Sequence, residues 1–374
     1  MNRINKYCVL AIGFIASLLL LYSCVEPFSP PEVNSDAKYL VIDGFLNMGS
    51  DTSRINLSHT QSSTATEAVL NEVGAIITAE EEKGQTYNFV EEGNGSYYLP
   101  HQNFNVTGKY RLHIKTANGK EYVSDYVEVK STPPIDSVAY KYDSRQEGGV
   151  MYVNTHDPKN LTRFYRWKFE ETWEYRSAFY SGLEVVNKQI ISRRENVNTC
   201  WRTIKSGNIL LGSTIKLSQD IIKDLPLTVV PVSTNKLYIK YSILVKQYGL
   251  TQDAFEYWTS LAKTTEGTGS LFDPLPSQVT GNFKCVTDSK ELVFGYFSAS
   301  VEQTKRIFIS PGLGAYPTCA RPDTLTISEA MNSTPGEVLL NFTGTRPDSV
   351  LYSNAACADC RAQGGTTTKP SFWQ

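Results

Sequence analysis

A run of alternating aromatic residues, "FYRWKFEETWEY" at positions 164–175, constrains the fold of this chain more than any other stretch. One set of alternate positions holds Tyr165, Trp167, Phe169, Trp173 and Tyr175, and the other holds Arg166, Lys168, Glu170, Thr172 and Glu174. Since successive side chains of a strand point to opposite faces, the pattern predicts a long strand with one face on a core. "NKLYIKYSILVKQY" repeats it with Leu237, Ile239, Tyr241, Ile243 and Val245. We therefore expect a mainly β protein.

Residues 38–130 are expected to form a separate β-sandwich domain. In "GKYRLHIKTANGKEYVSDYVEV", Tyr110, Leu112 and Ile114 alternate with polar residues, and Asn118-Gly119 then supplies a hairpin turn that requires positive φ. Short strands at this spacing are typical of a small sandwich. The stretch is similar to immunoglobulin-like and transthyretin-like modules, including the carboxypeptidase-regulatory-like kind, in which a Gly-x-Tyr-x-Leu-x-Ile strand precedes a hairpin.

The prolines at 133 and 134 end that module, and residues 135–374 are expected to form a larger β-rich domain. One helix-containing insertion interrupts it, with the helix near residues 251–263. Thr251 can cap this helix, Asp253 suits its first turn, and one face carries the apolar residues Ala254, Phe255, Trp258, Leu261 and Ala262.

The first 24 residues indicate export. Arg3 and Lys6 precede the apolar run "CVLAIGFIASLLLLY", which is short for a membrane span, and "LYSC" then ends at Cys24. This is similar to a bacterial lipobox, which predicts a signal peptide at 1–23, lipidation (palmitate among the acyl chains) of Cys24, and a Pro/Ser-rich tether at 24–37. The alternative is an ordinary signal peptide or an uncleaved anchor with an incidental cysteine.

Export to an oxidising compartment makes disulfides the expected state of the remaining cysteines. These are Cys200, Cys285, Cys319, Cys357 and Cys360, an odd number, so at least one thiol stays free or pairs elsewhere. Their spacing leaves the connectivity open.

The carboxy-terminal Cys357-x-x-Cys360 pair has three interpretations. A redox centre needs a cysteine at a helix N-terminus, and "RAQGGTTTKP" is a poor helix. A zinc knuckle would draw on Cys319 and either Cys200 or Cys285. The favoured interpretation is a disulfide-pinned clasp in which Phe372 and Trp373 tuck the terminus onto a β module.

No catalytic, cofactor or metal site is expected, so the protein is interpreted as a non-enzyme. The four histidines lack metal-ligand spacing, and no nucleophile elbow, P-loop or dinucleotide fingerprint occurs. Adjacent acids such as Glu170-Glu171 are expected on a solvated face. A net charge of -2 gives no footprint for nucleic acid. Loop aromatics are the candidates for ligand binding: Tyr97-Tyr98, Phe179-Tyr180 and Phe272.

Several stretches together resemble one family, the Bacteroidota lipoproteins of domain-of-unknown-function 4249. These are "LVIDGFL", "GKYRLHI", "YRWKF", "CWRT", "PLPSQVTGN", "VFGYFSAS" with "KRIFI", and "CADCRAQGGTTTKPSFW". The resemblance implies an outer-membrane lipoprotein that accompanies a TonB-dependent transporter, and it supplies no catalytic residues.

We therefore expect a lipid-anchored accessory protein of the outer membrane, exposed at the cell surface, with the periplasmic face of that membrane as the alternative. It would associate with a TonB-dependent β-barrel and help capture or gate a nutrient whose identity the sequence leaves open. The alternative is a structural or assembly subunit of a larger outer-membrane complex.

Overall fold

The computed structural model describes residues 38–61, 68–266, 279–344 and 348–374. The described residues from 39 to 59 and from 71 onward belong to one compact unit. The signal peptide, Cys24, the tether and Phe272 lie outside the described residues.

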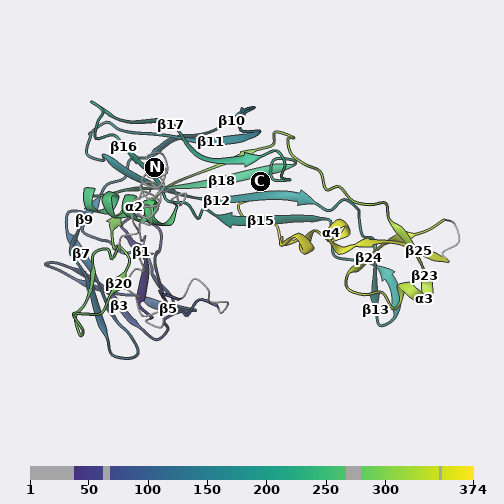
Figure 1. The fold of residues 1–374 in the computed structure, drawn as a ribbon, viewed down its shortest axis with the longest axis horizontal. Coiled ribbons are helices and arrows are strands. Elements are labelled where there is room, and N and C mark those ends of the chain that lie inside the picture. The colour runs from purple at the N-terminus through teal and green to yellow at the C-terminus, as the bar shows by residue number, and fades with distance from the viewer. Residues whose placement is uncertain (1–37, 62–67, 267–278, 345–347) are drawn as a thin grey trace, which may run out of the picture. The chain divides into compact units, whose positions relative to one another are not determined.

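The first module is a twelve-stranded sheet folded into a sandwich or barrel-like arrangement. Nine strands come from the region expected to form it (Figure 1): β1 (Leu40–Asn47), β2 (Ser53–His59), β3 (Ile76–Glu81), β4 (Thr86–Asn88), β5 (Val90–Gly93), β6 (Ser96–Leu99), β7 (Lys109–Lys115), β8 (Glu121–Ser124) and β9 (Val127–Lys130). In β7, Tyr110, Leu112 and Ile114 are buried, which confirms the predicted alternation. Gly119 has φ of 86° in the turn before β8, as the hairpin prediction requires.

The remaining three strands return to this sheet from much later in the chain. They are β19 (Phe283–Cys285), β20 (Val293–Phe294) and β21 (Ala299–Ser300). β20 and β21 both pair in parallel with β1, and β19 pairs antiparallel with β8. The first module therefore includes residues 283–300 as well as the expected 38–130. The side chains of Phe283, Phe297 and Ala299 are buried in its core.

One glycine permits this return. Gly295 has φ of 133°, and a Cβ atom on it would lie 2.2 Å from the carbonyl oxygen of Ile42 in β1. Only a residue without a side chain allows two backbones to approach so closely.

The second region is built from two facing sheets, as Figure 1 shows. One sheet has the order β10-β11-β17, and the other has the order β15-β12-β18-β22 with β16 beside β12. Their bounds are β10 (Ile135–Asp143), β11 (Gly148–Asp157), β12 (Phe164–Arg176), β15 (Thr199–Lys205), β16 (Leu210–Ser213), β17 (Asp220–Pro231), β18 (Lys240–Gly249) and β22 (Gln303–Ile309). Both sheets contribute side chains to one hydrophobic core.

Strand β12 confirms the prediction from the aromatic run. Tyr165, Trp167, Phe169, Trp173 and Tyr175 are all buried in the core between the two sheets. The indole of Trp167 donates a 2.8 Å hydrogen bond to Gln247, whose amide donates to the carbonyl of Pro133 at 2.8 Å. The linker is thereby fixed to the middle of the core.

The predicted helix is α2 (Gln252–Thr265), and Thr251 caps it by accepting a hydrogen bond from the amide of Ala254 at 3.2 Å. One hairpin and the last part of the chain form a further set of small elements. The hairpin consists of β13 (Leu183–Val186) and β14 (Gln189–Ser192). The later elements are β23 (Asp323–Thr326), α3 (Ile327–Ala330), β24 (Glu337–Phe342), β25 (Ser349–Asn354), α4 (Ala355–Ala358) and the 3-10 helix η1 (Cys360–Gln363). No helix in the described residues is long and apolar enough to cross a membrane.

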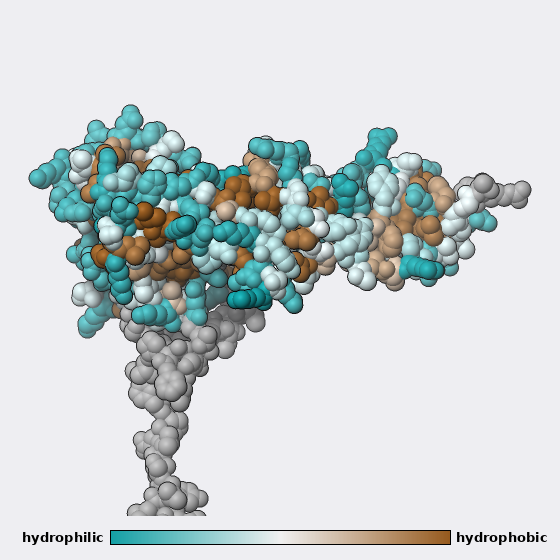
Figure 2. Space-filling model, turned by 90° about the horizontal axis from the view of Figure 1, so that it is seen from above, coloured by the Kyte–Doolittle hydropathy of each residue, from teal (hydrophilic) through white to brown (hydrophobic). Residues whose placement is uncertain are grey.

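The face seen in Figure 2 carries apolar side chains in separate patches among hydrophilic ones. The strands on either side of β11, which are β10 and β17, expose the apolar side chains Tyr142, Ile221 and Val229. Scattered exposure of this kind is ordinary for a folded surface and does not by itself indicate a site.

Candidate ligand-binding cleft

A cleft of about 560 Å³ lies between the first module and the polar face of β12. Its walls come from β1 and the loop and strand after it, from β12 and β18, from the end of β15, and from Glu302 just before β22. This volume falls within the usual range for small-molecule sites. The cleft exists because the polar face of β12 is covered by a second layer instead of facing solvent.

Charged side chains of both signs line the cleft. Lys246 forms a 2.8 Å ion pair with Glu170, and the hydroxyl of Tyr248 donates a hydrogen bond to Glu302. Burial, and then the charge of Glu302, raise the pKa of Tyr248, so this hydroxyl remains a donor. These groups therefore already have partners within the protein.

A narrow recess of about 30 Å³ opens beside the cleft and shares with it Asp43, Phe45, Lys168 and Tyr248. Its lining also includes Arg166 from β12 and Trp258 from α2. The guanidinium carbon of Arg166 lies 3.4 Å from the centre of the Trp258 ring, which is a close cation–π contact. The helical insertion thus brings an aromatic ring over the polar face of the long strand.

Arg166 has no hydrogen-bond acceptor or ion-pair partner among the described residues, and its Nε atom is buried. Burial lowers its pKa to about 10, although the nearby Asp43 opposes this effect. The side chain consequently keeps its positive charge at neutral pH. A buried donor without an acceptor is costly, so Arg166 is the strongest indication of ligand binding in this cleft.

The alternating pattern predicted Arg166 and Lys168 on the face of β12 away from the core, and this is where they lie. It did not predict that they line a site. The alternating pattern contained the signal for their side of the strand but none for the layer that covers them.

The acidic pair Glu170-Glu171 was expected on a solvated face, and for Glu171 this is wrong. The Glu171 side chain is 6% exposed and lies among the core residues of β12. It accepts hydrogen bonds from Lys236 at 3.0 Å and from Tyr241 at 2.8 Å. Position 171 falls between Phe169 and Trp173 in the alternation, which was the available signal.

The candidate loop aromatics that lie within the described residues do not form a site together. Tyr97 is buried because it lies in β6, where its hydroxyl donates to the carbonyl of Glu72 at 3.1 Å. Phe179 packs on a small core cluster, and Tyr180 is exposed. None of these residues lines the cleft.

The cysteines form two disulfides, Cys200–Cys360 and Cys319–Cys357. The two members of the Cys-x-x-Cys pair therefore bind different partners. Cys285, the fifth candidate, is a free and buried thiol in the first module. No cluster of three or more metal-ligating side chains occurs among the residues that the structure describes.

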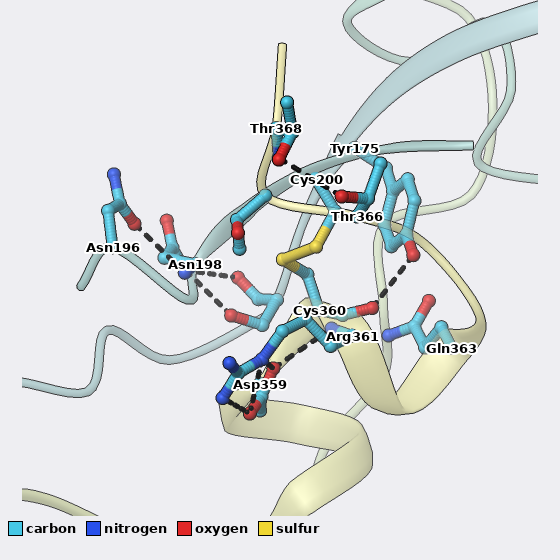
Figure 3. The surroundings of a disulfide bond; sticks show 12 residues. Tyr175, Asn196, Asn198, Cys200, Asp359, Cys360, Arg361, Gln363, Thr366 and Thr368 are labelled. Atoms are coloured by element: carbon cyan, nitrogen blue, oxygen red, sulfur yellow. Dashed lines mark hydrogen bonds and ion pairs between the residues drawn. A yellow bond between two sulfur atoms is a disulfide. The ribbon is translucent and has the colours of Figure 1, made fainter. Parts of the chain in front are cut away.

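Figure 3 shows how the carboxy-terminal segment lies around the Cys200–Cys360 bond. Tyr175 of β12 points at η1 and donates a 2.7 Å hydrogen bond to the carbonyl of Cys360. Thr366 exchanges two backbone hydrogen bonds of 2.9 Å with Trp201 of β15. Each glycine between Cys360 and Thr366 has its own reason: a Cβ atom on Gly365 would lie 2.2 Å from the Tyr175 hydroxyl, and Gly364 has φ of 82°.

The end of the segment matches the predicted clasp at Trp373, which is buried and meets Phe308 edge to face at 5.5 Å. Phe372 is 37% exposed and lies beneath the guanidinium of Arg306 at 3.6 Å. The clasp is thus a continuation of the second core, fixed by one disulfide and by tryptophan packing.

Residues 25–306 match a family described as Domain of unknown function (DUF4249). The match takes in more than half of the chain. The chain belongs to the DUF4249 family. None of the curated proteins matches this DUF4249 protein.

Two of the solved structures that match this DUF4249 protein are a chitinase and an adhesin. A chitinase from Bacillus thuringiensis shares 13% identity with a TM-score of 0.16, over 55% of this chain and 30% of the chitinase. The adhesin InvE from Yersinia pseudotuberculosis shares 10% identity with a TM-score of 0.17, over 84% of this chain and 73% of the adhesin. Scores this low carry no argument about fold or function.

Proposed function

We propose that this DUF4249 protein is a non-enzymatic, lipid-anchored accessory protein of the outer membrane that captures a nutrient for a TonB-dependent transporter. The observation that carries the capture step is the cleft beside β12, in which Arg166 has no acceptor among the described residues. A charged donor without an acceptor in a cleft is suited to binding a ligand that supplies one.

Anchoring is supported by the sequence alone. The lipobox-like "LYSC" places the acyl chains on Cys24, and a Pro/Ser-rich stretch separates that residue from the first strand. The two disulfides agree with export, since such bonds persist in oxidising compartments.

Anchoring is tested by changing Cys24 to serine and fractionating the cells. We expect the Cys24→Ser variant to leave the membrane fraction and to be recovered in soluble form. A variant that stays in the membrane fraction as the wild type does would contradict the lipid anchor.

The transporter partnership is tested by purifying the tagged full chain from native outer membranes in mild detergent. We expect a TonB-dependent β-barrel to co-purify in a fixed ratio. If no barrel co-purifies, the proposal fails.

A deletion strain separates nutrient capture from the structural alternative. Loss of growth on one nutrient source, with an intact envelope, is the expected result. A general envelope defect on every nutrient source would instead favour a structural or assembly role.

A further inference from the structure

The recess between α2 and β12 is lined by three hydrogen-bond donors that lack a full set of acceptors among the described residues. Among the described residues, Arg166 and the Ser298 hydroxyl make no side-chain hydrogen bond, and Lys168 has only Asp43 at 4.0 Å. Partial burial lowers the pKa of Lys168, and Asp43 opposes this shift. Three donors facing one small space favour an acceptor-rich group from outside the protein.

The charge in the recess is not balanced. Arg166 and Lys168 carry two positive charges, and Asp43 is the single acidic side chain among the lining residues. One further negative charge would neutralise the set. A guanidinium presents parallel N–H groups that match the two oxygens of a carboxylate, so this pairing gives direction as well as charge.

The size of the recess narrows the ligand chemistry. Its volume of about 30 Å³ has room for a planar group the size of one or two water molecules. A sugar ring does not fit there, whereas the adjoining cleft of about 560 Å³ has room for the rest of a small molecule.

We propose that this recess binds a carboxylate group of the ligand, with Arg166 and Ser298 donating hydrogen bonds and Lys168 supplying a second positive charge. Trp258 holds the guanidinium in place through the ring contact at 3.4 Å. The inference rests on the proposed function only in taking this ligand to be the captured nutrient.

A carboxylate of this kind has two natural sources, the end of a short peptide and an acidic sugar. Isothermal titration of the full chain in detergent separates them with four probes. Trialanine is compared with trialanine amide, and galacturonate is compared with galactose. Inorganic phosphate is the fifth probe and tests whether the recess prefers a tetrahedral anion.

Arg166→Met is the first variant, because methionine keeps the apolar contact with Trp258 and removes the charge. Arg306→Met is the matched control, since Arg306 is also stacked on a ring, that of Phe372 at 3.6 Å, and does not line the recess. Lys168→Met is a second variant. The Lys168 side chain is 40% exposed, so we expect this variant to fold, and it replaces Arg166→Met if that one does not.

We expect at least one carboxylate probe to bind the wild type, with its neutral counterpart showing no heat of binding. Arg166→Met should weaken this binding by about tenfold or more, and Lys168→Met should weaken it as well, whereas Arg306→Met should not. The carboxylate probe that binds identifies the source.

Three results would overturn the inference. In the first, neither carboxylate probe binds the wild type. In the second, a carboxylate probe binds Arg166→Met, or Lys168→Met if Arg166→Met does not fold, as tightly as it binds the wild type. In the third, phosphate binds more tightly than either carboxylate probe, and its binding depends on Arg166. Each leaves co-purification with a barrel unaffected, so the ligand class and the transporter partnership fail separately.

Discussion

Cys200 and Cys360 are joined by a disulfide although they are 160 residues apart in the sequence. The bond fixes η1 beside β15, and both cysteines are fully buried. A cross-link over so long a loop removes much of the freedom of the unfolded chain. The carboxy-terminal clasp is therefore a stabilising element of the second core, and it explains why the cysteines of the Cys-x-x-Cys pair do not bind each other.

Replacing both cysteines of this bond should lower the free energy of unfolding by about 5 kcal/mol on the loop-closure relation. The matched control is Cys319→Ser with Cys357→Ser, whose bond spans 38 residues and should contribute about 4 kcal/mol. Urea unfolding of both double variants measures the difference. A larger loss for the shorter loop would contradict this account.

Glu171 should be the most sensitive acidic residue of β12. Glu171→Gln leaves Lys236 partly buried without its partner, and we expect a loss of about 3 kcal/mol in the free energy of unfolding. The double variant Glu171→Gln, Lys236→Met removes the uncompensated charge and keeps an acceptor for the Tyr241 hydroxyl. Urea unfolding should show the double variant to be more stable than Glu171→Gln, and the opposite order would count against a charge effect.

Period-two alternation was sufficient to predict β7, β12 and β18, because each strand has one face on a core. It could not assign Glu171 a partner, since Lys236 lies 65 residues away and reaches it only through the folding of the sheet. The same limit applies to the two disulfides, because the five cysteines after Cys24 allow several pairings.

The candidate cleft was beyond sequence reasoning for a related reason. Arg166 looks like any polar residue on the outer face of a strand until α2 and β1 cover it. The strands at 283–300 that complete the first module have two or three residues each, too few to show any period. Both features depend on long-range pairing rather than on local pattern.

Gly295 should not tolerate a side chain. Its φ of 133° is unfavourable for other residues, and a Cβ atom would clash with the carbonyl of Ile42. We expect Gly295→Ala to lower the free energy of unfolding by about 2 kcal/mol or more. Gly207→Ala is the control, because a Cβ atom there meets nothing within 4 Å. Thermal unfolding of the two variants should differ clearly, and equal melting temperatures would show that the backbone approach is not tight.

Acid should weaken the turn that follows β11 through Asp157. Burial raises the pKa of this carboxyl, but the backbone amides of Lys159, Thr162 and Leu161 donate to it and together hold the pKa below its usual value. A carboxyl whose pKa is lower in the folded state stabilises the fold fully above its unfolded pKa, and this contribution is lost as the pH falls through the folded value.

Asp157→Asn should therefore be less stable than the wild type by about 1 kcal/mol at neutral pH. The gap should close as the pH falls from about 5 to below 3, because the wild-type carboxyl then becomes protonated. Urea unfolding at several pH values measures this gap. Asp323→Asn is the control, because the exposed Asp323 carboxylate accepts a single backbone hydrogen bond, from the amide of Thr324. A stability gap that stays constant over this pH range would mean that the hydrogen bonds of Asp157 do not depend on its charge.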